Sequence, residues 1–293
     1  MTPDAVPPDA VTPDAMVAVD AHHHLWTADY AWLADPALAR IRRDYTVEDL
    51  RGHLKAAGVD RTVLVEAASC EAAETRRFLA LAARTPEIVG VVGWASLTDP
   101  IVAATIAGHQ AAPGGSYLVG VRDQAQGHGD DWLDRPSVLA GVRAVAGAGL
   151  VNELVVRSAQ LPSVVRVLDA VPDGRFVLDH LGKPSVRDGR AGLDEWRALI
   201  APVAARPHVV AKVSGLVTEA DWAAWTVQDL RPFVETAVEL FGTDRLMFGS
   251  DWPVCELAAS YEQVKQSIVD ILGGTPADVF ASTAQRTYEL EIR

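Results

Sequence analysis

The chain has 293 residues, of which 49% are hydrophobic and 22% charged, and its formal net charge is −13. This profile is typical of a soluble globular protein with a substantial core. The negative charge argues against a nucleic acid or an anionic membrane as a partner. The sequence also lacks the apolar run of about 18 residues that a transmembrane helix needs. Its two cysteines, Cys70 and Cys255, are too few for a disulfide framework and indicate a cytoplasmic protein.

The first sixteen residues differ from the rest of the chain. They repeat a Pro-Asp-Ala unit and contain four prolines, without apolar periodicity. We expect a flexible tail at 1–16, followed by a single domain at 17–293. A start codon assigned too early, with Met16 as the true beginning, is an alternative explanation. The segment lacks the basic start and apolar stretch of a secretory signal.

Short apolar segments alternate with helical patterns along the rest of the chain. Thr46 and Gly58, for example, are the capping residues expected at the two ends of one helix. The expected strands are 17–24, 61–67, 88–94, 117–122, 152–156, 175–179, 208–213 and 245–249. The expected helices are 46–58, 71–84, 100–110, 136–149, 161–170, 193–205, 227–241, 261–272 and 276–282.

This alternation predicts the fold. Strands that are apolar on both faces and alternate with helices indicate a parallel sheet. Eight such units in about 270 residues favour a closed (β/α)₈ barrel of the TIM type. A doubly wound open sheet is the runner-up, but no Gly-x-Gly-x-x-Gly follows any expected strand.

The first strand ends in an unusual polar cluster, Asp20-Ala-His22-His23-His24-Leu-Trp26. In extended backbone Asp20, His22 and His24 share one face, and His23 points the other way. On a helix His22 and His24 would lie about 200° apart and could not share a ligand. The segment is therefore a candidate site, and the alternative is a loop of exposed histidines.

Other strand ends carry further polar or aromatic side chains. In a (β/α)₈ barrel these ends meet at the rim that holds the active site. The residues are Glu66, Trp94, Arg122, Asp179, His180, Lys212, Asp251 and Trp252. Strand alternation places Leu178 with His180, Val210 with Lys212, and Met247 and Gly249 with Asp251.

Each of these side chains also has a structural explanation. A lone histidine often only donates a hydrogen bond, Glu66 is suited to cap the next helix, and Arg122 to pair with Glu66. Lys212 is suited to a salt bridge, and Trp94 to the core. Convergence of five or more ionisable groups at one rim favours a functional site, because burying unpaired charge is costly. The remaining histidines are interpreted as structural or surface residues: His53, His109, His128 and His208.

Several segments together resemble a known family. They are Asp20–Trp26, Gly93–Trp94, Gly120–Arg122, Leu178–Pro184, Lys212–Leu216 and Arg245–Pro253. These segments occur in the order typical of the amidohydrolase superfamily and together span about residues 17–290, so the chain resembles that superfamily. The similarity is greatest to its lactonase branch, which includes L-fuconolactonase, L-rhamnonolactonase and 2-pyrone-4,6-dicarboxylate lactonase. The resemblance implies a (β/α)₈ barrel that hydrolyses a lactone to a hydroxy acid.

Some positions depart from the metal-rich members of that superfamily. Strand four offers Arg122 instead of a lysine or glutamate, and the segment 152–158 has no histidine. A two-metal centre is therefore not expected. The resemblance leaves two possibilities: one zinc or manganese ion, with His22, His24 and Asp251 as ligands, or catalysis without a metal. Glu66 stands where the lactonases often have glutamine.

The resemblance and the residue chemistry assign roles. Asp251 is the candidate general base, and His22, His24 and His180 surround the substrate carbonyl. The expected substrate contacts are Trp26, Glu66, Trp94, Arg122, Lys212 and Trp252. A neutral sugar lactone is favoured over a dicarboxylate lactone, although Arg122 and Lys212 leave room for an anionic one. The alternatives are a metal-dependent decarboxylase of the same barrel family and a non-catalytic barrel that binds a sugar acid. Nothing in the sequence marks an oligomer interface.

Overall fold

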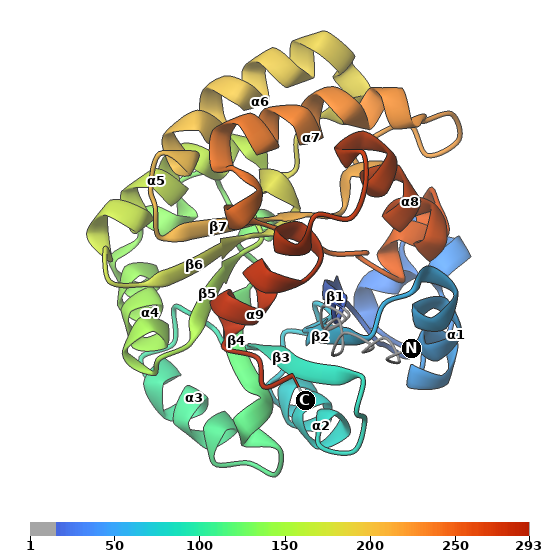
Figure 1. Ribbon diagram of the computed structural model, residues 1–293. Coiled ribbons are helices and arrows are strands. Elements are labelled where there is room, and N and C mark those ends of the chain that lie inside the picture. Colours follow the sequence, from blue (N-terminus) through green and yellow to red (C-terminus); the bar gives the residue numbers. More distant parts are fainter. Residues whose placement is uncertain (1–15, 293) are drawn as a thin grey trace, which may run out of the picture.

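In a computed structural model, residues 16–292 are described. The predicted tail lies outside the described residues except for Met16, so both it and the domain boundary stay predictions. Eight parallel strands pair in chain order and form the predicted barrel (Figure 1). They are β1 Val19–His23, β2 Arg61–Val65, β3 Ile88–Trp94, β4 Leu118–Asp123, β5 Val151–Leu154, β6 Arg175–Leu178, β7 Val209–Val213 and β8 Leu246–Phe248.

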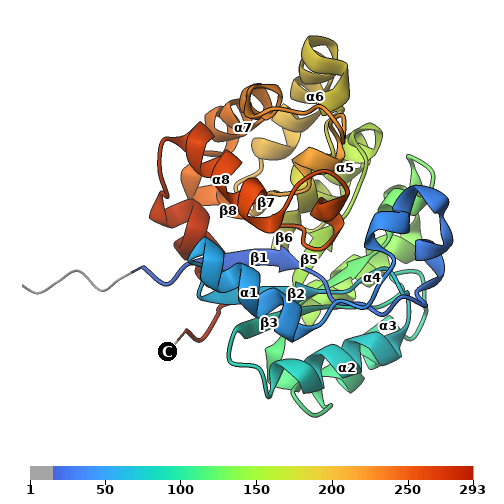
Figure 2. The same cartoon turned by 90° about the vertical axis from the view of Figure 1, so that its right-hand side faces the viewer.

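Helices surround the strands as an outer ring (Figures 1 and 2). They are α1 Val47–Ala57, α2 Ala72–Ala82, α3 Val102–Gln110, α4 Pro136–Gly147, α5 Leu161–Ala170, α6 Gly189–Ala204, α7 Val227–Phe241, α8 Tyr261–Leu272 and α9 Thr283–Tyr288. The expected final helix at 276–282 is a π-helical turn, Asp278–Ser282, that leads into α9. None of the helices among residues 16–292 is long and apolar enough to cross a membrane.

Residues at the ends of β1 and β8 complete the barrel. The amide of Asp251 donates to the carbonyl of His22 at 2.9 Å, and the amide of His24 donates to the carbonyl of Trp252 at 2.7 Å. The same segments carry the polar residues that the sequence places at the site. The backbone bonds that close the barrel therefore also fix the two halves of the site against each other.

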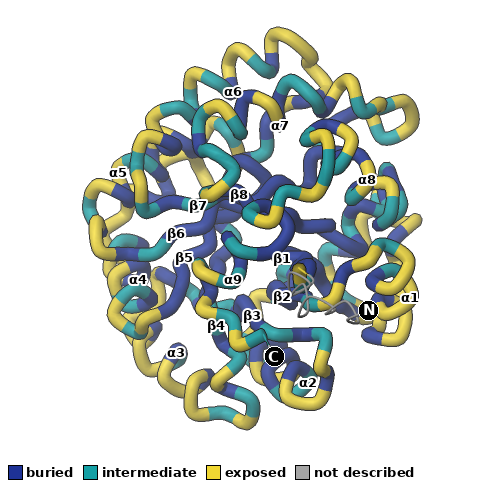
Figure 3. The backbone as a smooth tube through the Cα atoms, in the orientation of Figure 1, coloured by how far each residue is buried: buried dark blue, intermediate teal, exposed yellow. Residues whose placement is uncertain are grey.

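The barrel interior is filled by small and branched side chains. Val63, Val65, Val92, Val177 and Met247 belong to this inner layer. Ala284 and Tyr288 of α9 join it, and α9 lies across the centre of the ring in Figure 1. The C-terminal helix therefore closes the end of the barrel opposite the site. The strands are mostly buried, in contrast to the outer faces of the helices (Figure 3).

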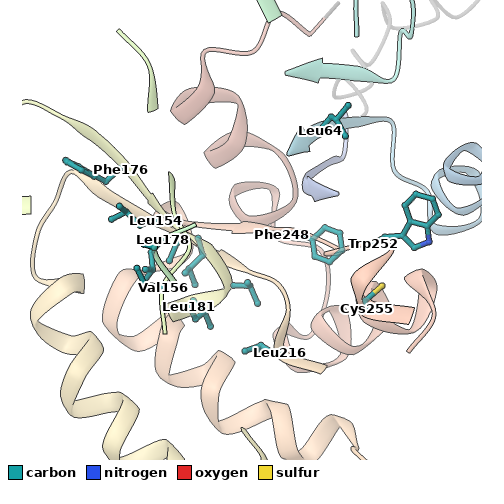
Figure 4. Packing of buried hydrophobic residues seen from close by; sticks show 14 of the residues in the cluster. Leu64, Leu154, Val156, Phe176, Leu178, Leu181, Leu216, Phe248, Trp252 and Cys255 are labelled. Carbon is teal, nitrogen blue, oxygen red and sulfur yellow. The ribbon is translucent and has the colours of Figure 1, made fainter. Parts of the chain in front are cut away.

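A second apolar layer lies between the strands and the helices. Leu154 of β5 pairs with Leu178 of β6, and the two lie beside Val156 in Figure 4. Their neighbours on the strands, Glu153 and Val177, are buried on the other face. Burial on both faces explains why these segments are almost continuously apolar in the sequence.

Candidate active site

A register irregularity in β1 shapes the first wall of the site. The pairing with β2 shifts between Asp20 and His23. Val19 and Ala21 face the barrel interior, whereas Asp20 accepts hydrogen bonds from Ser250 at 2.6 Å and from Tyr261 of α8 at 3.0 Å. The prediction that simple alternation places Asp20 beside His22 is therefore wrong, because the bulge turns the strand between them.

The predicted convergence of His22 and His24 is confirmed. Their Nε2 atoms lie 3.1 Å apart at the carboxyl end of β1. His23 is fully buried, and burial lowers the pKa of its imidazole to about 3. It is thus a neutral residue of the protein interior.

His180 and Asp251 reach the same point through left-handed backbone. Their φ angles are 53° and 56°, a conformation that costs a non-glycine residue about 1–3 kcal/mol. Alternation predicts that Leu178 and His180 share a face, which is wrong: Leu178 packs in the outer apolar layer. The turn after β6 redirects His180 into the site. Stored strain of this kind is common at functional residues.

Two glycines make room for the rings of these histidines. A Cβ atom on Gly215, which has a φ of +66°, would lie 2.6 Å from Nδ1 of His180. A Cβ atom on Gly249 would lie 2.6 Å from Cβ of His22. Neither position can accept a side chain without displacing a histidine.

His22, His24, His180 and Asp251 form what we call the histidine–aspartate cluster. Oδ1 of Asp251 lies 3.8 Å from Nε2 of His22, 3.5 Å from Nε2 of His24 and 3.9 Å from Nε2 of His180. All four residues are buried, with at most 5% of any residue exposed. Three imidazole nitrogens thus surround one carboxylate oxygen.

Neighbouring groups determine which nitrogen of each ring is available. Nδ1 of His24 faces the carbonyl of Val65 at 3.0 Å and donates a hydrogen bond to it, so Nε2 is the nitrogen that faces the cluster. Nδ1 of His180 pairs with Oγ of Ser214 at 2.8 Å. Nδ1 of His22 lies 3.3 Å from Asp179 and 3.2 Å from Lys212. These contacts orient every Nε2 toward Asp251.

Burial favours the neutral forms of His22 and His180, whereas Asp251 stays charged in spite of its burial. Burial, reinforced by Lys212, lowers the pKa of His22 well below its usual value, and burial lowers the pKa of His180 to about 4. Burial favours the neutral form of Asp251, but His180 and His24 outweigh it and lower the pKa of that carboxyl. At neutral pH the cluster therefore holds the uncharged imidazoles of His22 and His180 beside a carboxylate.

This donor set fits one divalent ion. Neighbouring ligands of tetrahedral zinc are separated by about 3.3 Å, given zinc–ligand distances of about 2.0–2.2 Å. The separations among His22, His24 and Asp251 are 3.1, 3.5 and 3.8 Å. The ligating atoms of His22, His180 and Asp251 also lie within 4.8 Å of one another. His180 is thus an alternative to His24 as the third ligand.

The charge around the cluster supports the same conclusion. Beneath it, Arg122 donates to Glu66 at 2.6 Å and to Asp179 at 3.0 Å. Lys212 lies 2.8 Å from both oxygens of Glu153. With all their carboxyl groups ionised, these groups and Asp251 contain two more negative than positive charges. A divalent cation would balance that excess.

Glu153 is a site residue that the sequence analysis missed. It is 3% exposed and lies on β5, within the apolar segment Asn152–Val156. Burial, with a contribution from Asp179, raises the pKa of Glu153 to about 7. A charged residue in the middle of an apolar strand was the signal that could have identified it.

A cavity of about 170 Å³ opens above the cluster. Five predicted site residues line it: His24, Trp26, Arg122, His180 and Asp251. Its other walls come from Trp32, Ala67, Ala68, Gln124, Gln126, Val155, Lys183, Thr218 and Val254. Trp32 was not predicted because it lies in the long loop between β1 and α1.

The other predicted site residues lie behind this cavity wall. Glu66 and Lys212 are completely buried in the charge network. Trp94 donates to Asp123 at 3.1 Å, and the fully buried Trp252 donates to Glu256 at 2.9 Å. His22 lies beneath His24 and His180 in the histidine–aspartate cluster. Of the three tryptophans predicted to contact substrate, Trp26 is the one that faces the cavity.

A larger hollow of about 940 Å³ lies outside the barrel between α1 and α2. Its lining contains Arg51 and Arg77 but none of the four cluster residues. The smaller cavity is the candidate active site, because it combines concavity with convergent polar groups of shifted pKa.

The remaining histidines lie away from the cavity. His53 pairs with Glu262 at 2.7 Å, and His128 stacks on Trp132. His208 contacts the carbonyl of Leu168 at 3.3 Å, and His109 is buried on α3. Their expected structural or surface positions are confirmed.

The fold and the site together define a class. A parallel (β/α)₈ barrel with a His-x-His pair at the end of β1 and an aspartate after β8 is a metal-binding type of hydrolase barrel. The chain belongs to the amidohydrolase family, whose pattern matches residues 19–290. This confirms the resemblance seen in the sequence.

Individual relatives cover nearly the whole chain. An L-fucono-1,5-lactonase of Burkholderia multivorans is 35% identical over 291 residues, 93% of this chain and 96% of the relative. An amidohydrolase structure from Burkholderia multivorans with bound zinc is 34% identical, with a TM-score of 0.87 over 94% of this chain and 99% of the other. A putative 2-pyrone-4,6-dicarboxylic acid hydrolase of Pseudomonas putida shares the fold, with 23% identity and a TM-score of 0.76 over 95% of this chain and 99% of the other.

Proposed function

We propose that this protein hydrolyses a neutral aldonolactone, such as L-fucono-1,5-lactone, to the open hydroxy acid. The observation that carries the proposal is the convergence of three imidazoles on the carboxylate of Asp251 at the floor of the cavity. The L-fucono-1,5-lactonase relative, similar over 93% of the chain, supports the substrate class.

The charge of the cavity favours a neutral substrate over a dicarboxylate. Arg122 donates hydrogen bonds to the carboxylate and the backbone carbonyl of Glu66 and to the carboxylate of Asp179. Its positive charge is therefore already compensated within the protein. Lys212 is completely buried below the cavity. Lys183 lines the cavity but lies 3.9 Å from Glu219. A substrate carboxylate would meet no uncompensated cation among the lining residues.

The same walls suit a sugar ring. Trp26 and Trp32 lie 5.0 Å apart between ring centres and present apolar surface to the cavity. Gln124 and Gln126 also line the cavity, and Oε1 of Gln126 provides an acceptor for a hydroxyl group. Aromatic faces combined with side-chain amides are appropriate for a polyhydroxylated ring with one apolar face.

Asp251 acts as the general base in the proposed mechanism. Its carboxylate removes a proton from a water molecule, whose oxygen attacks the lactone carbonyl carbon. The carbon–oxygen bond of the ring then breaks, and Asp251 returns the proton to the departing ring oxygen. Its lowered pKa keeps it ionised and ready for the first step at neutral pH.

The histidines stabilise the charge that develops on the carbonyl oxygen. When Ser214 donates to Nδ1 of His180, Nε2 carries a proton and serves as a donor at the cavity floor. One well-placed donor of this kind is worth about 3–4 kcal/mol of transition-state stabilisation. A divalent ion held by His22, Asp251 and either His24 or His180 would supply additional polarisation of the carbonyl and a more acidic water.

A substrate panel tests this function. The purified protein is assayed by pH indicator against neutral aldonolactones, 2-pyrone-4,6-dicarboxylate and carboxylated phenols, with carbon dioxide release measured in parallel. We expect ring opening of at least one neutral aldonolactone. Carbon dioxide release without lactone turnover would identify a decarboxylase. Ligand binding without any turnover would identify a sugar-acid-binding barrel.

A further inference from the structure

A second group of cation-binding atoms lies beneath the histidine–aspartate cluster. The ligating atoms of His22, Glu153 and Asp179 lie within 4.8 Å of one another. His22, Glu153 and Asp179 are all buried, the most exposed at 3%. Two carboxylates and an imidazole are a donor set that zinc accepts.

The ammonium group of Lys212 lies inside this group of atoms. Nζ of Lys212 is 2.8 Å from each oxygen of Glu153, 3.2 Å from Oδ1 of Asp179 and 3.2 Å from Nδ1 of His22. Lys212 comes from β7, and Glu153 and Asp179 come from β5 and the end of β6. Its ammonium thus makes contacts with each of the three residues that would hold an ion.

Asp179 gives an independent sign that this position is suited to an ion. Its Oδ1 atom is completely buried and has no partner with the geometry of a hydrogen bond among the described residues. Its contacts with Lys212 and His22, at 3.2 and 3.3 Å, are therefore electrostatic. Hydrogen bonds depend on direction, whereas a point charge satisfies an oxygen from any side.

The position is closed to bulk water. Tyr288 of α9 donates a hydrogen bond to Glu153 from the opposite end of the barrel. The apolar inner layer, including Val151 and Met247, surrounds this contact. A buried charge requires compensation within the protein, and Lys212 provides it for both carboxylates.

We propose that the ammonium group of Lys212 occupies the position that a second metal ion would take among His22, Glu153 and Asp179. It holds Glu153 and Asp179 in place, positions His22 through Asp179, and limits the barrel to the ion of the histidine–aspartate cluster. Lys212 is a positioning residue, because the completely buried side chain does not reach the cavity. The inference does not depend on lactone hydrolysis.

Metal stoichiometry tests the proposal without a substrate. The wild-type protein and the Lys212→Ala variant are dialysed against zinc, desalted and analysed for bound metal. We expect Lys212→Ala to bind one more zinc ion per chain than the wild type, because truncation leaves Glu153, Asp179 and Nδ1 of His22 around an empty position. His22 then bridges the two ions as an imidazolate, which forms when its ring releases its remaining N–H proton to a solvent base. Lys212→Met, which fills the space without a charge, is expected to match the wild type.

Two further measurements locate the additional ion. The double variant Lys212→Ala/Glu153→Gln lacks one anionic ligand and is expected to return to the wild-type stoichiometry. Cobalt loading reports the same difference as an additional d–d absorption band in Lys212→Ala. An unchanged stoichiometry in folded Lys212→Ala would overturn the proposal. If that variant does not fold, Lys212→Ser is measured in its place, with the same expectation and the same contradicting result.

Discussion

The Nε2 atoms of His22 and His24 lie 3.1 Å apart, and both imidazoles are buried. Val65 accepts from Nδ1 of His24, so the lone pair of its Nε2 faces His22. Asp251 brings a carboxylate oxygen within 3.5 Å of the same atom. Acceptor atoms this close are stabilised by a cation or a shared proton, which makes this pair the structural basis of the metal prediction.

Zinc should raise the thermal stability of the chelator-treated protein. A ligand at about 100 times its dissociation constant stabilises the folded state by about 2.7 kcal/mol. We expect His24→Ala to bind zinc more weakly and to reduce the shift in Tm, measured by calorimetry. His128→Ala, which removes an exposed histidine stacked on Trp132, is the control and should keep the full shift. A full shift in His24→Ala would exclude His24 as a ligand.

Trp32 is expected to contribute to substrate binding. Its half-buried ring lines the cavity, and its Nε1 donates to the carbonyl of Ala67 at 2.9 Å. Trp32→Ala should raise KM for a neutral aldonolactone about tenfold, which corresponds to about 1.4 kcal/mol. Trp225→Ala is the matched control, because the ring of Trp225 donates a hydrogen bond to the carbonyl of Ala258 and does not line the cavity. Equal KM values for wild type and Trp32→Ala would remove Trp32 from the binding site.

Tyr288→Phe should destabilise the barrel from its far end. The change leaves buried Glu153 without the donor that α9 supplies. Loss of one partner from a buried hydrogen bond costs about 1–3 kcal/mol, which denaturant unfolding can measure. The half-buried Tyr117 offers a comparison, since Tyr117→Phe is expected to change the unfolding free energy by less than about 0.5 kcal/mol. Equal effects of the two substitutions would contradict the role given to Tyr288.

The buried neutral His23 should make the protein sensitive to acid. Its pKa is about 3 in the folded protein and 6.5 ordinarily, so below pH 6.5 the unfolded chain binds a proton that the folded chain does not. The contribution of His23 is therefore constant above pH 6.5 and becomes unfavourable as the pH falls towards 3. The slope is about 1.4 kcal/mol per pH unit.

Urea unfolding between pH 7 and 5 measures this effect. Below pH 6.5 the unfolding free energy of the His23→Gln variant should fall less steeply than that of the wild type. The difference is expected to be about 1.4 kcal/mol per pH unit. His53→Gln, at a half-buried position bonded to Glu262, provides a histidine control. Parallel pH profiles for wild type and His23→Gln would show that His23 titrates normally in the folded protein.

The barrel was predictable because its signals are repeated along the chain. Alternating strands and helices with capping residues such as Thr46 and Gly58 indicated the topology, and the structure confirms it. The pairing of His22 with His24 also followed from extended backbone. Such features depend on local sequence, which a single chain contains in full.

Other features depend on tertiary structure and could not be predicted. Left-handed backbone at His180 and Asp251 overrides strand alternation, and the surrounding fold stabilises it. The sequence left Arg122 open between substrate contact and a pair with Glu66, and the structure shows that Glu66 and Asp179 occupy its donors. The partners of Glu153 could not be predicted, because they come from β7 and α9, which the fold brings to the same barrel interior.

Replacement of Asp251 tests the central claim most directly. Asp251→Asn keeps the shape of the side chain but removes the base, and Asp173→Asn at an exposed turn is the control. Both variants and the wild type are assayed on a neutral aldonolactone, with the fold and zinc content measured for each. We predict that kcat falls at least about 100-fold in Asp251→Asn, the usual contribution of a positioned general base, and stays unchanged in Asp173→Asn. A folded Asp251→Asn protein with near-normal kcat would contradict the account.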